Sequence, residues 1–149
     1  MAASRLLAID YGSKRIGAAI SDADGKFVSP LKMIPAGRGL NDDVAAILSV
    51  AAEYDAGEFI VGLPLNMDGT EGDQAKLCRQ LGDFLAKQSG KTVHFVDERL
   101  SSFSAEEKLQ GADWTRRQKR ARLDSIAAQH ILQHYLDSVR EGQKKASPE

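Results

Sequence analysis

Three acidic residues stand where the sequence pattern predicts the end of a strand or the apolar face of a helix. They are Asp10, Glu98 and Asp124. A carboxylate that leaves water must be neutralised, hydrogen-bonded or bound to a metal ion. If the three side chains converge, a hard divalent cation is their simplest shared partner, and cations held by carboxylates carry out phosphoryl-transfer chemistry.

Two of these acids follow apolar runs that predict strands. Asp10 follows Leu6–Ile9, where it either caps the turn that begins there or belongs to a site. Glu98 follows Asp97 after the run Val93–Val96. Because side chains alternate across a strand, only one of these adjacent acids can share the face of Asp10. We favour Glu98 and expect Asp97 to serve as a turn or cap residue.

The third acid, Asp124, precedes a helical stripe of small and apolar residues. On a helix it shares a face with Ala128 and Ile131, four and seven positions later. One interpretation is that Asp124 complements the positive end of the helix dipole near the helix start. The other is that the helix packs on a sheet and holds its acid over the edge of that sheet.

Positive charge is concentrated near these acids, although the whole chain has a formal net charge of −1. Lys14 and Arg15 follow Asp10 across a short turn, as a phosphate-handling turn requires. Arg99 either pairs with an acid or binds a phosphate in a bidentate manner. The basic segment Trp114–Arg122 predicts contact with a phosphate backbone, and its candidate residues are Arg116, Arg117, Lys119 and Arg120.

The elements that must position these residues follow from the hydrophobic periodicity. Apolar alternation predicts strands over residues 5–10, 15–21, 27–33, 58–61 and 93–96. Helical spacing predicts helices over residues 40–56, 70–89, 104–111 and 123–139. Thr70 and Asp73 have the spacing of a capping box for the second helix.

This order of elements predicts an α/β fold. Its mixed five-stranded sheet begins with an antiparallel β-meander, continues with parallel strands joined by right-handed crossovers, and is flanked by helices. We expect a single domain over residues 1–141 and a disordered tail over residues 142–149. Ligands of such sheets gather outside the carboxyl ends of the parallel strands, where Asp10, Gly62–Asn66 and Asp97–Glu98 all stand.

Composition narrows the class of protein further. Hydrophobic residues make up 42% of the 149 residues and charged residues 28%, as in a globular protein. Cys78 is the only cysteine, which excludes a disulfide framework and a thiolate metal site. The N-terminal segment lacks the apolar core of a signal peptide, and no run approaches membrane-spanning length. We therefore expect a cytoplasmic protein that does not contact a membrane.

Four segments of the chain, in order, resemble the YqgF/RuvX family. They are Ile9–Asp22, Val61–Gly69, Asp97–Ser102 and Asp124–Leu136. The resemblance spans nearly the whole chain and implies an RNase H-like fold and a metal-dependent nuclease. It also implies that Asp10, Glu98 and Asp124 are the catalytic residues and metal ligands, and that Arg15, Arg99 and Lys119 lie near the substrate.

The expected cofactor is Mg²⁺ or Mn²⁺, with two ions held by the three acids. The resemblance implies a nucleic-acid substrate, for which we favour precursor 16S rRNA, with branched DNA as the alternative. A four-way junction would favour a homodimer, whereas an rRNA end would not require one.

Two further classes of protein compete with this interpretation. A phosphotransferase of the actin and sugar-kinase type shares an Asp-x-Gly turn after its first strand. Such enzymes bind nucleotide between two domains of this kind, and only one is expected here. The other competitor is a non-catalytic nucleic-acid-binding or ribosome-assembly module that retains the acids without cutting.

Overall fold

The structure, a computed structural model, describes the backbone of residues 4–100 and 116–146 and the side chains of residues 4–99 and 126–142. The elements follow one another as β1 (Arg5–Tyr11), β2 (Arg15–Ser21), β3 (Val28–Pro30), β4 (Ile34–Pro35), α1 (Leu40–Glu53), β5 (Ala56–Leu63), α2 (Asp73–Ser89), β6 (Val93–Asp97), the 3-10 helix η1 (Glu98–Leu100) and α4 (Arg116–Ala146).

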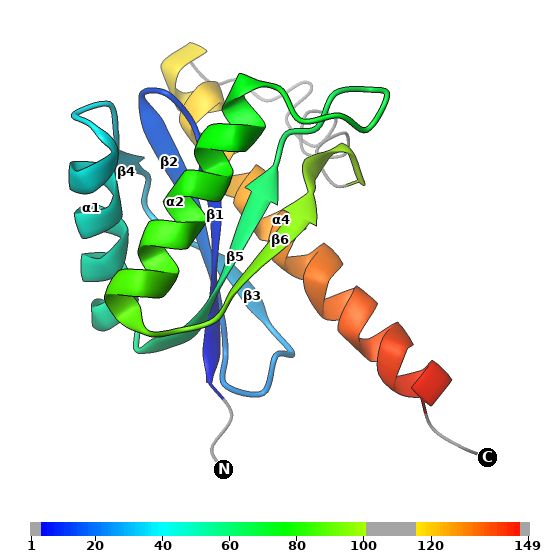
Figure 1. The fold of residues 1–149 in the computed structure, drawn as a ribbon. Helices are drawn as coiled ribbons and strands as arrows, with labels where there is room; N and C mark the ends of the chain where they lie inside the picture. Colours follow the sequence, from blue (N-terminus) through cyan, green and yellow to red (C-terminus); the bar gives the residue numbers. More distant parts are fainter. Residues whose placement is uncertain (1–3, 101–115, 147–149) are drawn as a thin grey trace.

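All the described strands belong to one mixed sheet, in the order β3-β2-β1-β5-β6, and β4 also pairs with β2. Strands β1, β2 and β3 are antiparallel neighbours, whereas β1, β5 and β6 run parallel. The parallel strands therefore end at a common edge, which is the upper edge of the sheet in Figure 1. This arrangement confirms the predicted α/β fold and its mixed sheet.

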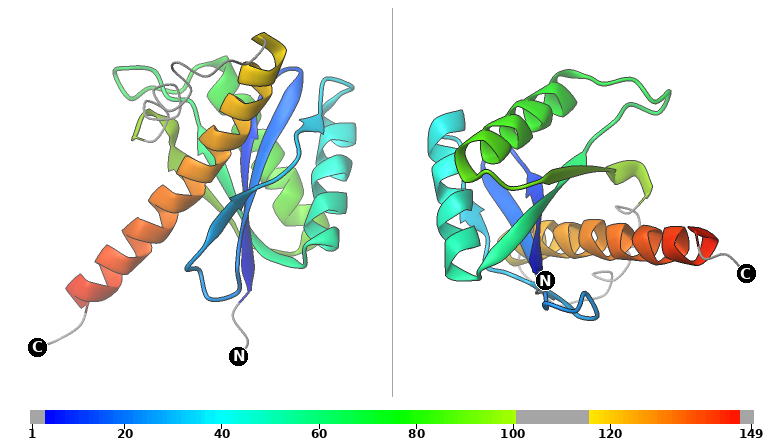
Figure 2. Two further views of the ribbon diagram at one scale, coloured as in Figure 1. Left: turned by 180° about the vertical axis from the view of Figure 1, so that it is seen from behind. Right: turned by 60° about the horizontal axis from the view of Figure 1, so that its bottom comes forward.

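Helices cover both faces of the sheet. Helices α1 and α2 lie on one face, and α4 crosses the opposite face and extends beyond it (Figures 1 and 2). Each interface has its own apolar core. The larger core lies under α1 and α2, and the smaller one, which includes Ala128, Ile131 and Leu132 of α4, lies under that helix. Among the described residues, no helix could span a membrane.

The sheet has six strands rather than the predicted five. The predicted strand over residues 27–33 is divided into β3 and β4, which pair with different parts of β2. Strand β3 ends at Pro30, and Leu31, the next residue, still donates its N–H to the carbonyl of Ala18 at 2.8 Å.

The last helix is longer than predicted at both ends. It begins at Arg116 rather than near residue 123, because the arginine, lysine, glutamine and alanine residues of the basic segment are good helix formers. It continues to Ala146, so residues 142–146 are helical and not part of a disordered tail. The helix predicted over residues 104–111 lies outside the described residues.

The predicted capping box is also absent from the start of α2. The N-cap of this helix is Gly72, which makes no side-chain cap hydrogen bond. Thr70 instead donates its backbone N–H and its hydroxyl to Asp68, within the preceding loop. Its hydroxyl also accepts from the side-chain amide of Asn66, so the polar groups of Thr70 are engaged within the loop before the helix begins.

Candidate active site

Strand β1 directs its final carboxylate toward the α4 face of the sheet. Leu6 and Ala8 of this strand belong to the core under α4, whereas Leu7 and Ile9 belong to the core under α1 and α2. Asp10 continues the series of Leu6 and Ala8, because alternate residues of a strand share a face. It thus stands on the α4 face at the carboxyl edge of the sheet.

The same reasoning settles which acid after β6 faces Asp10. Val96 belongs to the core under α4, while Phe95 packs on the opposite core. Glu98, two positions after Val96, begins η1, and its side chain meets that of Asp10. Asp97 faces away from this contact and binds Arg99. Glu98, rather than Asp97, is therefore the acid that meets Asp10, and its role as a metal ligand stays a prediction.

The two carboxyl groups are hydrogen-bonded to each other, so one of them holds a proton in the absence of a cation. Burial raises the pKa of Asp10. Burial first, and then the charge of Asp10, raises the pKa of Glu98 to about 9. Such a pair is typical of functional carboxylate sites, because two buried like charges cannot both ionise without compensation.

Glycine at position 62 permits this contact. A Cβ at Gly62 would lie 2.5 Å from Oε1 of Glu98 and 2.7 Å from Cδ1 of Ile131. Gly62 therefore makes room for the glutamate and for the close approach of α4 to β5. In the sequence, Gly62 is recognisable only as part of a strand end. Its packing role depends on two residues that are distant in sequence.

Asp124 lies within α4, eight residues after its first described residue. The helix therefore begins too early for Asp124 to complement the dipole at its first turn, which excludes that alternative. Ala128 and Ile131, one and two turns later, are buried against the sheet. The backbone position of Asp124 thus continues the sheet-facing stripe of α4. Its side chain lies outside the described part of the structure.

Residues from both flanking helices hold the end of β1. The hydroxyl of Tyr11 donates a hydrogen bond to the buried carboxylate of Asp43 at the start of α1. The backbone N–H of Gly37 donates to the same carboxylate at 3.2 Å. Gln74, in the first turn of α2, donates its side-chain amide to the carbonyl of Tyr11 at 2.9 Å. Sequence reasoning missed this arrangement, since no local pattern links residues 11, 43 and 74.

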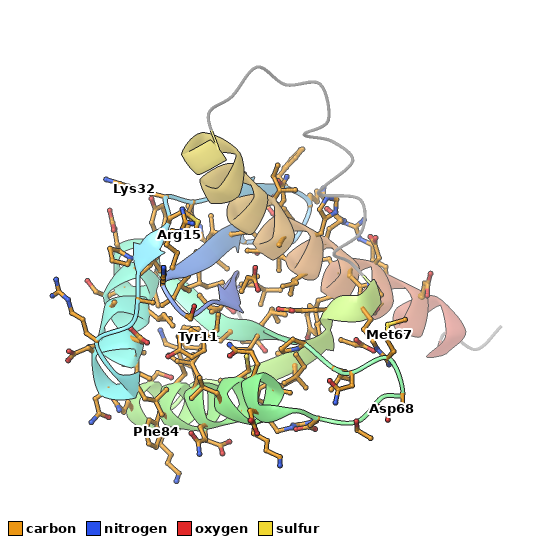
Figure 3. All side chains as sticks on the ribbon, turned by 90° about the horizontal axis from the view of Figure 1, so that it is seen from above. Tyr11, Arg15, Lys32, Met67, Asp68 and Phe84 are labelled. Carbon is orange, nitrogen blue, oxygen red and sulfur yellow. The ribbon has the colours of Figure 1, made fainter. Side chains whose placement is uncertain are left out.

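The predicted cations lie on the β1–β2 turn, at the start of β2 and on α4. Lys14 is exposed in the turn between β1 and β2, and Arg15 begins β2. Viewed onto the carboxyl ends of the parallel strands, Arg15 and Tyr11 lie on one side and Met67 on the other (Figure 3). The basic residues at positions 116, 117, 119 and 120 lie on α4, and their side chains lie outside the described part of the structure.

The donor set of the pair fits a hard divalent cation. Carboxylate oxygens are the ligands that Mg²⁺ and Mn²⁺ prefer. A cation between Asp10 and Glu98 would replace the shared proton and offset the cost of burying both charges. Among the side chains that the structure describes, no cluster of three His, Cys, Asp or Glu residues forms a metal site. A third ligand from Asp124 remains a prediction.

Comparison with solved structures defines the class of fold. The chain aligns with the RuvC of Thermus thermophilus in complex with a Holliday junction, with a TM-score of 0.59, 13% identity and coverage of 93% of this chain and 96% of that chain. It also aligns with the yeast mitochondrial Holliday junction resolvase Ydc2, with a TM-score of 0.53, 11% identity and coverage of 97% and 85%. The fold is thus that of the RNase H-like resolvases.

Comparison of sequences then identifies the family. The family model of RuvX, described as a Holliday junction resolvase, matches residues 4–138, and the chain belongs to this family. Relatives named for pre-16S rRNA nuclease activity include one from Myxococcus xanthus, 41% identical over 91% of this chain and 89% of the relative. Another, from Moorella thermoacetica, is 41% identical over 91% of this chain and 96% of the relative. Membership of this family classes the chain as a nuclease.

Proposed function

We propose that this protein is a divalent-metal-dependent nuclease that hydrolyses phosphodiester bonds in precursor 16S rRNA, at its 5′ end. The observation that carries the proposal is the half-buried, hydrogen-bonded pair of Asp10 and Glu98 at the carboxyl edge of the parallel strands. Ligands of open α/β sheets bind at this edge. The names of the sequence relatives support rRNA as the substrate.

Each predicted residue then has a defined task. Asp10, Glu98 and Asp124 would hold Mg²⁺ or Mn²⁺, and two ions fit the number of acids. When bound, the metal supplies an activated water and neutralises the charge that develops on the phosphate. The predicted substrate contacts are Lys14 and Arg15 at the β1–β2 turn and Arg116, Arg117, Lys119 and Arg120 on α4.

The decisive experiment is a cleavage assay with Asp10→Asn. The substitution keeps the size of the side chain but removes a metal-binding charge, so we expect cleavage to fall at least about 100-fold with little change in melting temperature. Asp83→Asn, an exposed change on α2, is the matched control and should cut at the wild-type rate. Wild-type activity of the Asp10 variant, in a preparation free of contaminating nuclease, would refute the mechanism.

The second candidate function is resolution of four-way DNA junctions, because the family model carries that description. Both substrates present the same phosphodiester, and selectivity depends on groove shape and 2′-OH contacts. The assay should therefore offer precursor rRNA and a four-way junction side by side. Preferential cutting of the junction by a homodimer would favour the resolvase. Tight binding of both without cutting in Mg²⁺ or Mn²⁺ would favour a non-catalytic ribosome-assembly module.

An rRNA-processing role also places the protein in the cytoplasm, where ribosomal precursors mature. Partners other than nucleic acid are not required by this function. The stoichiometry on a short rRNA substrate, measured by light scattering, should be one chain per cleavage site.

A further inference from the structure

The segment Asp97–Glu98–Arg99 directs its side chains to opposite sides of the strand end. Glu98 faces Asp10, while its two neighbours bind each other. Nη2 of Arg99 lies 2.7 Å from Oδ2 of Asp97, and Nε lies 3.1 and 3.0 Å from the two carboxylate oxygens. The backbone N–H of Arg99 also donates to Oδ1 of Asp97 at 2.9 Å. The ion pair therefore joins the two residues on either side of Glu98.

The same guanidinium reaches a second segment of the chain. Nη1 of Arg99 donates to the carbonyl oxygens of Asn66 and Met67, at 3.2 and 3.1 Å. These residues belong to the loop between β5 and α2, which spans residues 64–72. Arg99 thus connects the strand end that carries Glu98 to the loop that follows β5.

This loop is itself ordered by hydrogen bonds. The backbone N–H of Asn66 donates to the carbonyl of Thr70 at 2.9 Å, and that of Gly69 donates to the carbonyl of Asn66 at 2.8 Å. The side-chain amide of Asn66 donates to the hydroxyl of Thr70 at 3.0 Å. A loop with such internal bonds can act as a fixed support, so its link to Arg99 restrains the strand end rather than a mobile segment.

Arg99 has little donor capacity left for a phosphate. Its Nε and Nη2 bind Asp97, and its Nη1 binds two carbonyl oxygens. A bidentate phosphate contact requires two parallel N–H donors of the same guanidinium. Arg99 could provide them only by giving up bonds that hold the strand end in place.

We propose that Arg99 is a positioning residue, which together with Asp97 fixes Glu98 toward Asp10 by tying the end of β6 to the β5–α2 loop. This inference rests on the proposed nuclease function, and it assigns Arg99 a role other than phosphate binding. Positioning within a fraction of an ångström matters here, since a displacement of about 1 Å at a catalytic group can cost about 100-fold in rate.

A double-mutant cycle separates the two roles of Arg99. A positioning role predicts that Arg99→Gln and Asp97→Ala each lower kcat by about 10- to 100-fold. The double variant should be no worse than either single variant, because both break one unit. A phosphate-binding role predicts the opposite for Asp97→Ala, since removal of the acid frees the guanidinium and strengthens substrate binding.

The salt dependence of binding provides a second readout that does not need cleavage. Binding of a short single-stranded RNA is measured without divalent metal at several salt concentrations. Loss of one phosphate contact reduces the slope of log K against log salt by about 0.7. We expect Arg99→Gln to leave this slope unchanged. A reduced slope, a wild-type kcat, or strictly additive effects in the cycle would each overturn the proposal.

The chain provides a matched control in the ion pair of Glu71 and Arg79. This pair is also bidentate and partly exposed, with Nη2 of Arg79 2.7 Å from the carboxylate, but it ties the loop to α2 and not to Glu98. Because the Arg79 guanidinium also lies over the Phe95 ring of β6, the glutamate variant is the control. Glu71→Ala should leave kcat within about twofold of wild type. Exposed pairs contribute little to stability, so this control and the variants of the cycle should melt near the wild-type temperature.

The failure of this inference is distinguishable from failure of the proposed function. If the wild-type protein cuts neither RNA nor junction DNA, the nuclease proposal fails. The positioning role is then judged by the binding slope and by the amide hydrogen exchange of residues 64–72. Exchange that rises in Arg99→Gln but not in Lys87→Gln, an exposed change in the last turn of α2, at an unchanged slope, would support it, and equal exchange in the two variants would refute it.

Discussion

At the scale of residues, the proposed chemistry depends on the contact between Asp10 and Glu98. Both are acidic, both have raised pKa values because of burial, and they share a proton. Nearby, burial and then the charges of Glu98 and Asp10 raise the pKa of the Cys78 thiol to about 12. The thiolate is the reactive form of cysteine, so Cys78 is not a nucleophile at neutral pH.

The proton held by the pair leads to a prediction for Glu98→Gln. Glutamine resembles the protonated carboxyl group and can donate a hydrogen bond to Asp10, so the metal-free variant should melt close to the wild-type temperature. Mn²⁺ should stabilise only the wild type, by about 2.7 kcal/mol at a concentration 100 times its Kd. Thermal unfolding with and without Mn²⁺ measures both effects.

Glu53→Gln, an exposed change at the end of α1, is the control for this experiment and should respond to Mn²⁺ as the wild type does. Equal stabilisation of Glu98→Gln by Mn²⁺ would mean that Glu98 does not bind the metal.

At the scale of elements, the site depends on how closely α4 packs on β5 and how the end of β1 is held. Gly62 decides the first, because Ile131 of α4 and the side chain of Glu98 both occupy the space beside it. Tyr11 decides the second, because it joins β1 to α1 through Asp43 and to α2 through Gln74. The packing at Gly62 acts on Glu98, which lies beside it in space. The hydrogen bonds of Tyr11 act on Asp10, which precedes it in the chain.

We expect Gly62→Ala to destabilise the fold by about 1–3 kcal/mol, the usual cost of overpacking, and to reduce cleavage further by displacing Glu98. Chemical denaturation and the cleavage assay measure these two effects. Gly142→Ala is the control, since a Cβ at this helical position meets no atom within 4 Å. It should stabilise the protein by up to about 1 kcal/mol. A fully stable, fully active Gly62→Ala would contradict the packing argument.

Tyr11→Phe removes the hydroxyl that donates to the buried carboxylate of Asp43. A buried acceptor that loses its donor costs about 1–3 kcal/mol, and urea unfolding should show a loss of this size. Tyr135→Phe is the matched change on α4, where the ring packs beside His94 at 4.9 Å and this ring contact is retained. It should change stability by less than about 0.5 kcal/mol. Equal effects of the two variants would contradict a specific role for the Tyr11 hydroxyl.

At the scale of the whole molecule, a nearly neutral chain must bind a polyanion through a local surface. The formal net charge of −1 excludes a general electrostatic attraction. The β1–β2 turn and the first turns of α4 carry the cations that the sequence analysis assigns to the substrate. Binding should therefore depend on few phosphate contacts and on their location.

The corresponding prediction concerns Lys14→Gln. It should weaken binding of single-stranded RNA and reduce the slope of log K against log salt by about 0.7, the effect of one phosphate contact. Lys87 is an exposed residue in the last turn of α2, and this end of the helix lies away from the carboxyl edge of the sheet (Figure 1). Lys87→Gln should leave the slope unchanged. Equal slopes for the wild type, Lys14→Gln and Lys87→Gln would mean that the substrate does not contact Lys14.

Much of this protein is determined by local sequence alone. The alternation of apolar residues predicts β1, β2, β5 and β6, and the order of elements predicts the parallel pairing that brings Asp10 and Glu98 to one edge. Strand and helix periodicity is encoded within a few residues, so it can be read without the fold. Membership of the RuvX family confirms the resemblance of the four sequence segments.

The tertiary structure decides which atoms meet at that edge. The choice of Glu98 over Asp97 follows from the burial of Val96 under α4, and two of the partners of Arg99 lie in a loop more than thirty positions earlier. The start of α4 removes the dipole explanation for Asp124. The first two outcomes depend on contacts between segments distant in sequence, whose free energies come from packing and burial. The early start of α4 follows instead from the helix propensity of its basic segment.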